Sequence, residues 1–341
     1  MAKIQTKLED LLTFDNLFQA YIQASKSKHH RRNVDRFEQN LYANLVQLLQ
    51  ELKDGTYQPR SCYKFEIYCT AGQKRRLISA PQFRDCVVQH LIYQNLYWQF
   101  DKKFIFDSYG CRKGKGPQRA AKRVYNFVQQ HEPADYYCQL DMRKYYYSID
   151  HNILREILVH DIEDQSLIEL MMKFCTNSTG VGLEVGNVIS QFFGMIYLNR
   201  LDHYCKRVLK IKHYIRYVDD IVIITNSKQQ AQLIKQTVEQ YIKSVLNMPL
   251  SKCKIQPIKH GINFSGMRTF PHYSVIRKRS LRNLNRAIKA NRWNSVQSIL
   301  SHCIISNSYH RCLLKIPFNH VLNLPKRYRL DHFDAYYHKE E

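Results

Sequence analysis

Residues 214–225 read Tyr-Ile-Arg-Tyr-Val-Asp-Asp-Ile-Val-Ile-Ile-Thr, so that two apolar runs flank the adjacent carboxylates of Asp219 and Asp220. The β-branched and aromatic residues on both sides predict two strands, 214–217 and 221–225. Ionised side chains are seldom found between such strands without a partner. One interpretation is a simple hairpin turn, although neither Asn-Gly nor Gly-X, the usual tight-turn pairs, is present. The other is a functional pair of carboxylates.

A third carboxylate follows another short apolar run. Asp141 comes directly after Tyr-Tyr-Cys-Gln-Leu at 136–140, which predicts a strand. If the strands pair, three negative charges converge, and like charges raise one another's pKa values unless a cation neutralises them. Mg²⁺ is the hard, oxygen-seeking cation that suits such a site, with Mn²⁺ as an alternative. Two such ions, roughly 4 Å apart, support an in-line phosphoryl displacement.

The charge of the chain points to a polyanionic partner. Its 341 residues include 52 Lys and Arg against 29 Asp and Glu, a net charge of +23. No Asp or Glu occurs from residue 240 to 330, while Lys and Arg recur throughout. A surface that meets a phosphate backbone has a reason to exclude carboxylates, whereas a merely solvated surface mixes both signs. Nucleic acid is the expected partner, and the basic run 26–32 is either a solvated loop or an RNA contact.

Several protein classes do not fit the composition. No stretch approaches the roughly 20 apolar residues of a membrane span, and the start of the chain lacks a signal-peptide apolar region. We therefore expect a cytoplasmic protein that does not contact a membrane. Ten cysteines show no close CxxC spacing and fifteen histidines contain no HExxH pair, which argues against structural zinc and a zinc hydrolase. The cysteines are expected to be reduced thiols.

Local patterns predict the order of the remaining elements. Helices are expected at 41–52, 87–100, from Pro117 onward, after the capping residue Asp150, and up to 201. Strand-like alternation covers 63–80. Basic or Gly-punctuated loops are expected at 109–117 and 180–191, and a helical bundle beyond 271. The 109–117 loop is not a Walker loop, because no Lys-Ser/Thr closes it.

The motifs and their order resemble those of reverse transcriptases. Tyr217-Val-Asp219-Asp220 is similar to the YxDD box of that family, and Gln139-Leu-Asp141-Met-Arg-Lys-Tyr-Tyr146 to its first catalytic-aspartate motif. The further matching segments, in chain order, are Arg76–Ala80 with Asp85–Gln89, Gly182–Gln191, Leu250–Gln256 and Phe264–Gly266. The resemblance covers about residues 35–270.

The resemblance implies an α/β (α+β) fold with the right-hand architecture of polymerases. N-terminal helices and fingers are expected at 1–130, and a palm with a small antiparallel sheet backed by helices at 131–270. A fingers segment is expected near 165–190, and a basic helical thumb at 271–341.

The resemblance also assigns roles. Asp141, Asp219 and Asp220 bind two metal ions and are catalytic. Tyr146 is the aromatic gate against a 2′-hydroxyl, or else a core tyrosine. Lys252 assists the leaving pyrophosphate, although Lys254 leaves the register open. The other implied nucleotide-binding residues are Lys74, Arg76, Val185 and Gly186, of which the two cations are alternatively solvated charges. The implied template and primer contacts are Arg112, Lys113, Lys115, Ser190, Gln191 and Gly266.

Departures from the common pattern suggest a subtype. Ser190-Gln191 replaces the Ser-Pro of most reverse transcriptases. Together with Gly186-Asn187 ahead of it and the Arg-Lys-Gly-Lys-Gly segment at 112–116, this is similar to the diversity-generating retroelement enzymes, which are encoded by bacteria and their phages. Val185 stands where accurate enzymes have a glutamine, so we expect errors opposite template adenines during mutagenic retrohoming. Cys86 and Ser265 depart where arginine and leucine are usual, which affects local packing. The implied partners are dNTPs, a template RNA with its primer or cDNA, and a small basic helical accessory protein.

Other readings of the chain remain open. Retron, group II intron and phage-defence reverse transcriptases are the neighbouring subtypes. A non-catalytic RNA-binding scaffold is an alternative of a different class, but such a protein has no need for buried carboxylates at Asp141, Asp219 and Asp220.

Overall fold

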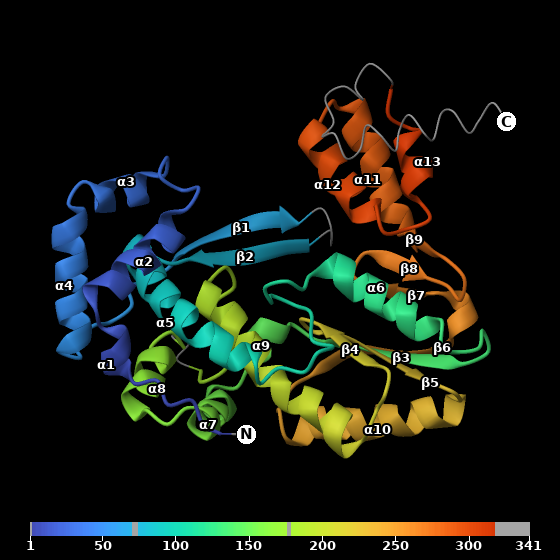
Figure 1. Ribbon diagram of the computed structural model, residues 1–341, viewed down its shortest axis with the longest axis horizontal. Coiled ribbons are helices and arrows are strands. Elements are labelled where there is room, and N and C mark those ends of the chain that lie inside the picture. Colours follow the sequence, from blue (N-terminus) through green and yellow to red (C-terminus); the bar gives the residue numbers. More distant parts are fainter. Residues whose placement is uncertain (1, 70–73, 176–178, 318–341) are drawn as a thin grey trace. The chain divides into compact units, whose positions relative to one another are not determined.

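The computed structural model describes residues 2–69, 74–175 and 179–317, and it contains two compact units (Figure 1). The first unit comprises Met1–Phe106, Met142–Leu209 and Glu239–Ser251. The second comprises Asp107–Asp141, Lys210–Val238 and Lys252–Glu341. Each unit is therefore assembled from segments that are far apart in the sequence.

The first unit is mainly helical. Its helices are α1 (Leu8–Leu11), α2 (Phe14–Ser25), α3 (Arg32–Glu38), α4 (Leu41–Lys53), α5 (Phe83–Asp101), α7 (His151–Asp161), α8 (Gln165–Met172) and α9 (Val188–His203), which continues into a π-helical turn, Tyr204–Val208. Twelve of the sixteen residues of α9 are buried, as expected for a helix that is apolar on every side. Helix α5 packs against both α2 and α9 and completes the core.

Two antiparallel strands, β1 (Tyr63–Cys69) and β2 (Lys74–Ala80), form the sheet of the first unit. The alternation of Tyr63, Phe65 and Ile67 predicts this strand correctly, but all three side chains are exposed and do not face a core. A 3₁₀ turn, Tyr145–Ser148, precedes α7. As predicted, the side chain of Asp150 caps α7 by accepting hydrogen bonds from the backbone nitrogens of Asn152 and Ile153.

The second unit contains a four-stranded sheet in the order β4-β5-β3-β6. The strands are β3 (Tyr136–Met142), β4 (Tyr214–Tyr217), β5 (Asp220–Thr225) and β6 (Leu250–Pro257), and α10 (Lys228–Ser244) follows β5. Helix α6 (Pro117–Val128) begins at the predicted proline and packs Val124 and Phe127 into a core shared with Ile215 and Val222. Strand β5 pairs antiparallel with both β3 and β4.

A second sheet and a helical bundle complete this unit. The sheet consists of β7 (Ile262–Phe264), β8 (Met267–Thr269) and β9 (Ser274–Ile276). The bundle consists of α11 (Lys278–Lys289), α12 (Trp293–Cys303) and α13 (Tyr309–Leu313), with a core around Leu284, Val296 and Leu300. The helical bundle predicted beyond residue 271 is thus confirmed from Lys278 to Leu313, although strand β9 precedes it. Residues 318–341, which the prediction assigns to a thumb, lie outside the described residues.

The loop predicted at 180–191 is too long at its C-terminal end. Helix α9 begins at Val188, so Ser190 and Gln191 lie in its first turn. The reason is that Ile189, Phe192 and their neighbours are buried at helical spacing. This burial favours a helix more strongly than the preceding glycines favour a loop. The division into fingers, palm and thumb remains a prediction. Within the described part of the chain, no helix has the length and apolar character needed to cross a membrane.

Candidate functional site

Strand pairing in the second unit brings two of the predicted aspartates together. In the antiparallel register of β3 and β5, Asp141 is the direct partner of Asp220. Asp141 is exposed and Asp220 half-buried, as is Asp219. The expectation of three buried carboxylates is therefore wrong: Asp219 and Asp220 are only half-buried, and Asp141 is exposed because its side chain lies on the opposite face of β3 from the buried Leu140 and Met142.

Asp219 lies in a two-residue turn. Tyr217 pairs with Asp220, so Val218 and Asp219 alone connect β4 to β5. Val218 has a φ of 57°, a left-handed conformation that is rare for a β-branched residue. The Asp pair thus does belong to a hairpin turn, but one without the glycine or asparagine that this conformation favours. A turn of this kind persists only if its surroundings hold it.

Arg216 supplies part of that support. Its side chain is 1% exposed, and its Nη1 donates a hydrogen bond to the carbonyl oxygen of Val218 at 2.8 Å. Its backbone is also fixed: the nitrogen of Tyr109 donates to the oxygen of Arg216 at 2.9 Å, and the nitrogen of Arg216 donates to the oxygen of Asp107 at 3.0 Å. A segment more than one hundred residues earlier thereby runs alongside β4.

Gly110 continues that segment and lies against the turn. A Cβ atom on Gly110 would come 2.5 Å from the backbone nitrogen and 2.6 Å from the Cγ2 of Val218. Real Cβ atoms do not approach this closely, so only glycine fits unless the turn moves. The basic, glycine-rich loop that is expected to contact template and primer is therefore packed at its start against the turn that carries Asp219.

The surroundings of Asp220 disfavour the negative charge of its carboxylate. Burial raises the pKa of Asp220 to about 7, and the negative charges of Asp141 and Asp219 add to this increase. The side-chain amide of Gln139 opposes it, because its Nε2 donates to Oδ1 of Asp220 at 2.8 Å and to the oxygen of Asn263 at 2.9 Å. The charges of all three aspartates are therefore coupled.

Arg277 is the cation that acts on Asp220. It precedes α11, its charge lowers the pKa of Asp220, and burial lowers its own pKa. Its Nε atom is buried and has no hydrogen-bond partner among the described residues. Arg277 therefore offsets only part of the negative charge at this site.

The donor chemistry of the three aspartates fits a hard divalent cation. They offer carboxylate oxygens, and a cation relieves the like charge that raises the pKa of Asp220. Across residues 2–69, 74–175 and 179–317, however, no three or more His, Cys, Asp or Glu side chains lie together in a group that could hold a metal ion. Magnesium often binds through one or two carboxylates together with waters and substrate phosphates, so an open protein ligand set is compatible with it.

Several predicted nucleotide-binding residues come together in the first unit. The backbone oxygen of Val185 accepts a hydrogen bond from the nitrogen of Ser79 on β2 at 2.9 Å. Gly186 has a φ of 119°, and a Cβ atom there would lie 3.0 Å from Ile78 Cγ2 and 3.1 Å from the oxygen of Ser79. The loop before α9 is therefore docked on β2, and Arg76 is exposed on that same strand.

Tyr146 is half-buried in the 3₁₀ turn beside Tyr145, with ring centroids 5.1 Å apart. Gly194 of α9 makes room for both rings, because a Cβ there would lie 3.0 Å from Tyr146 and 3.2 Å from Tyr145. The hydroxyl of Tyr145 donates to the carbonyl oxygen of Gly194. Tyr145 is the buried core tyrosine of the pair, which leaves Tyr146 the more accessible ring.

The other predicted residues are dispersed. Ser190 is buried and Gln191 exposed on α9, and the side chains of Lys74 and Lys252 lie outside the described part of β2 and β6. Gly266, with a φ of 83°, lies in the turn between β7 and β8 against His302. In the loop after Gly110, Arg112 donates to the oxygen of Ser108 at 3.0 Å, Lys115 lies 4.6 Å from the ring centre of Tyr109, and Lys113 is exposed.

Gln139, Gly110, Arg216 and Arg277 belong to the site but have no role predicted from the sequence. Gln139 had a usable signal, because residues two apart in a strand face the same side and Gln139 is two residues before Asp141. The other three had none, since their roles depend on contacts between distant segments.

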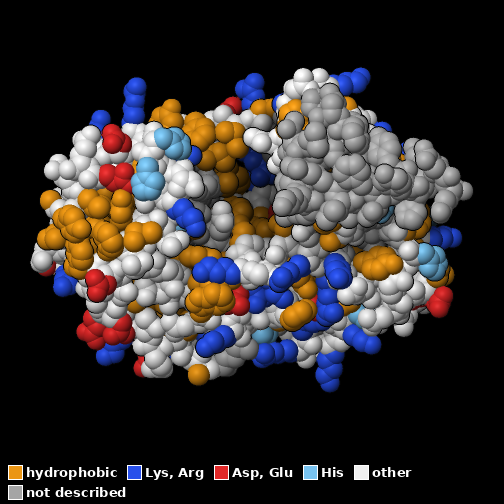
Figure 2. Space-filling model, turned by 45° about the horizontal axis from the view of Figure 1, so that its top comes forward, with side chains coloured by type: hydrophobic (Ala, Val, Ile, Leu, Met, Phe, Trp, Pro, Cys, Tyr) orange, Lys and Arg blue, Asp and Glu red, His pale blue; other side chains and the backbone are white. Residues whose placement is uncertain are grey.

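On the face drawn in Figure 2, Lys and Arg side chains are frequent and carboxylates sparse, in line with the net charge.

Comparison with known proteins gives consistent matches. The family described as "Reverse transcriptase (RNA-dependent DNA polymerase)" matches residues 69–269. The group II intron-encoded protein LtrA of Lactococcus lactis subsp. cremoris is 22% identical over 282 residues, which cover 62% of this chain and 46% of that protein. The putative COX1/OXI3 intron 2 protein of Saccharomyces cerevisiae is 21% identical over 315 residues, 71% of this chain and 36% of that protein. The chain thus spans less than half the length of these relatives.

Proposed function

Because the chain belongs to the reverse transcriptase (RNA-dependent DNA polymerase) family, we propose that it extends a primer with dNTPs on an RNA template at Asp141, Asp219 and Asp220. The family match agrees with the observed mixture of helices and a small antiparallel sheet, the fold expected of a right-hand polymerase. The observation that carries the assignment of the site is the pairing of Asp141 with Asp220 beside the turn that holds Asp219.

In this proposal the residues have distinct tasks. Asp141, Asp219 and Asp220 hold two Mg²⁺ ions, with Mn²⁺ as an alternative. The bound ions would lower the pKa of the primer 3′-hydroxyl and stabilise the departing pyrophosphate. Gln139 orients the carboxylate of Asp220 through its hydrogen bond, and Arg277 keeps part of its charge neutralised when no ion is bound. Arg216 and Gly110 hold the turn so that Asp219 keeps its position.

The same proposal gives the first unit the recognition of the nucleotide. Arg76, with Lys74, pairs with the triphosphate, and Tyr146 packs beneath the sugar. Val185 and Gly186 form the surface against the incoming base pair, while Lys252 assists the leaving pyrophosphate. Arg112, Lys113, Lys115, Ser190, Gln191 and Gly266 contact template and primer. What supports these roles is their match to the family motifs and the docking of the Val185 loop on β2.

Two subtypes are candidates for the biological role. Ser190-Gln191 and Val185 favour a diversity-generating retroelement enzyme that makes errors opposite template adenines, acting in the cytoplasm with a structured RNA and a small basic helical accessory protein. The curated relatives favour a group II intron type. Sequencing of cDNA made from a defined RNA separates the two, because substitutions concentrated at template adenines support the first.

The catalytic assignment is tested with Asp219→Asn. This change removes one negative charge but keeps the size of the side chain, so synthesis from dNTPs on a primed RNA template should fall to background. Binding of the primed template should remain close to that of the unaltered protein, because the contacts to nucleic acid lie elsewhere. Retained synthesis by Asp219→Asn would refute the site, and a complete lack of synthesis by the unaltered protein would favour an RNA-binding scaffold.

A further inference from the structure

The first unit contains a large open groove that none of the proposed catalytic or nucleotide-binding residues line. Its volume is about 1450 Å³. Its walls come from α3, α4, the start of α5, the first residue of β1 and the last residue of β2. Small-molecule sites usually occupy roughly 300–1,000 Å³ and are mostly apolar. This groove is larger, and its lining is rich in arginine and in the side-chain amides of asparagine and glutamine, so a polymeric polar ligand suits it better.

Three arginines give the groove its charge. Arg32 and Arg36 are one helical turn apart on α3 and Arg60 precedes β1; all three are exposed. Residues four apart share one face of a helix, so Arg32 and Arg36 present their guanidinium groups together. Within the described ranges, no carboxylate forms an ion pair with any of the three. Their charges are thus available to an anionic ligand.

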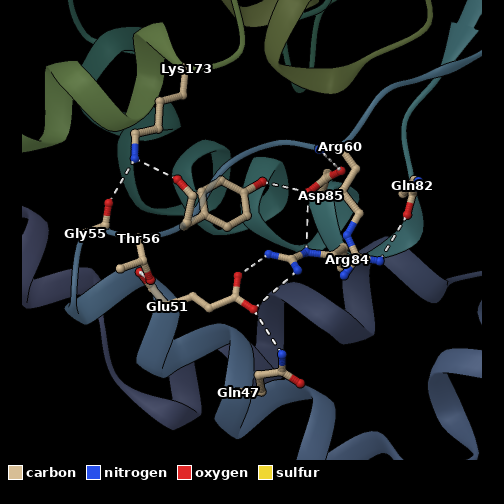
Figure 3. A network of polar contacts seen from close by, with 10 residues as sticks. Gln47, Glu51, Gly55, Thr56, Arg60, Gln82, Arg84, Asp85 and Lys173 are labelled. Carbon is tan, nitrogen blue, oxygen red and sulfur yellow. Dashed lines mark hydrogen bonds and ion pairs between the residues drawn. The ribbon is translucent and has the colours of Figure 1, made fainter.

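Two acidic residues next to the groove, Glu51 and Asp85, form ion pairs with Arg84 (Figure 3). Glu51 forms an ion pair with Arg84 and accepts a hydrogen bond from Gln47 at 3.2 Å. Asp85 is 1% exposed and accepts hydrogen bonds from the hydroxyl of Tyr57 at 2.8 Å and the backbone nitrogen of Arg60 at 3.0 Å. This network leaves the cations exposed and also fixes the backbone position of Arg60.

Aromatic rings extend the groove along β1. Tyr63 lines it and is 73% exposed, and its ring stacks with that of Phe65, which is 39% exposed, at a centroid distance of 5.9 Å. Exposed aromatic rings beside cations are the usual platform for unpaired bases, whose faces are hidden in a duplex. The side-chain amides of Asn33 and Gln82, which also line the groove, can bond base edges.

We propose that this groove binds single-stranded RNA, with Arg32, Arg36 and Arg60 on its phosphates and Tyr63 stacked on a base. The inference rests on the proposed function in one respect, the choice of RNA as the nucleic acid. It adds a binding site outside the three aspartates and the predicted contacts to template and primer. An acidic peptide would also meet the arginines, but it would not use the exposed stack of Tyr63 and Phe65.

Salt dependence of binding is the direct test. The full chain is titrated, without dNTPs, against a fluorescently labelled oligouridine of about 20 nucleotides at several salt concentrations. Each phosphate contact to a single strand contributes about 0.7 to the slope of log affinity against log salt. Arg32→Ala/Arg36→Ala should therefore reduce the slope by about 1.4 and weaken binding at every salt concentration. Tyr63→Ala should weaken binding without changing the slope.

A matched variant controls for net charge. Lys53→Ala/Lys102→Ala removes the same two charges from exposed positions of the first unit that do not line the groove, and its slope should equal that of the unaltered protein. The proposal is overturned if both double variants have the same slope, or if duplex RNA of the same length binds as tightly as the single strand. Failure of polymerase activity leaves this measurement intact, so the two proposals can fail separately.

Discussion

Gly110 and Val218 are in contact so close that the Cβ atom of any larger residue at 110 would lie 2.5 Å from the backbone nitrogen of Val218. The two residues are 108 positions apart, and the contact joins a basic loop to the strained turn that carries Asp219. Since metal-binding carboxylates act only when correctly placed, this contact links the loop to the proposed chemistry.

Gly110→Ala should displace the turn and with it Asp219. We expect kcat for dNTP incorporation to fall on the order of 10- to 100-fold, the scale of a misplacement of about 1 Å, and the Mg²⁺ concentration for half-maximal activity to rise. Steady-state kinetics over a Mg²⁺ titration measures both quantities. A purely structural role would lower the amount of folded enzyme and leave the Mg²⁺ response unchanged.

Gly114→Ala is the control for strain in the same loop. Gly114 also has a positive φ, of 70°, but a Cβ there would meet only Arg119 Nη1, at an ordinary 3.6 Å. This variant should lose some stability and keep the Mg²⁺ response of the unaltered enzyme. Equal Mg²⁺ responses for Gly110→Ala and Gly114→Ala would contradict the positioning role of Gly110.

The raised pKa of Asp220 predicts how stability depends on pH. Its carboxyl ionises near 3.8 in the unfolded chain and near 7 in the folded, metal-free protein. Between these values the folded state binds more protons, so this group makes the protein less stable as pH rises from about 4 to about 7. Asp220→Asn lacks this titration, and its Tm relative to the unaltered protein should therefore increase across that window and level off above it.

Thermal denaturation in EDTA from pH 4 to 8 measures this difference. Asp15→Asn, at an exposed position on α2, is the matched control for the loss of one carboxylate outside this site. Added Mg²⁺ should raise the Tm of the unaltered protein more at pH 8 than at pH 5, because bound cations favour the ionised carboxylates. A Tm difference between Asp220→Asn and the unaltered protein that is constant with pH would argue against charge coupling at this site.

Tyr146 should determine which sugar is accepted. Tyr146→Ala removes the ring expected beneath the sugar, so incorporation of ribonucleotides relative to deoxynucleotides should increase, on the order of tenfold or more for a lost steric barrier of about 1.4 kcal/mol. Primer extension with competing nucleotides measures this ratio. Tyr146→Phe keeps the ring and should retain the selectivity, and an unchanged ratio for Tyr146→Ala would make Tyr146 a packing residue.

Val185→Gln tests the basis of infidelity. The hydrogen bond that docks the loop joins the backbone oxygen of Val185 to the nitrogen of Ser79, so the side chain can be exchanged without losing that hydrogen bond. Glutamine restores hydrogen-bonding groups, and we expect fewer substitutions opposite template adenines in sequenced cDNA. Val185→Leu, which stays apolar, should keep the original error pattern. Equal error rates for the glutamine and leucine variants would remove Val185 from the explanation.

Local structure could be predicted from the sequence because its causes are local. Pro117 starts α6, Asp150 caps α7, and Gly55 follows α4 with a positive φ of 71°, each as its residue type favours. The start of α9 at Val188 was missed, since the glycines before it suggest a longer loop than the buried face of the helix allows.

The sequence by itself determined which residues can carry charge chemistry: an Asp pair between two apolar runs, a third Asp after another, and a net charge of +23 that favours a polyanion. Only the tertiary structure decided that Asp141 is the partner of Asp220, that Val218 is strained, and that Gly110 and Arg216 support its turn. The physical reason is that strand register, burial and close contact arise when distant segments pack together, and packing leaves no periodic trace in any one segment.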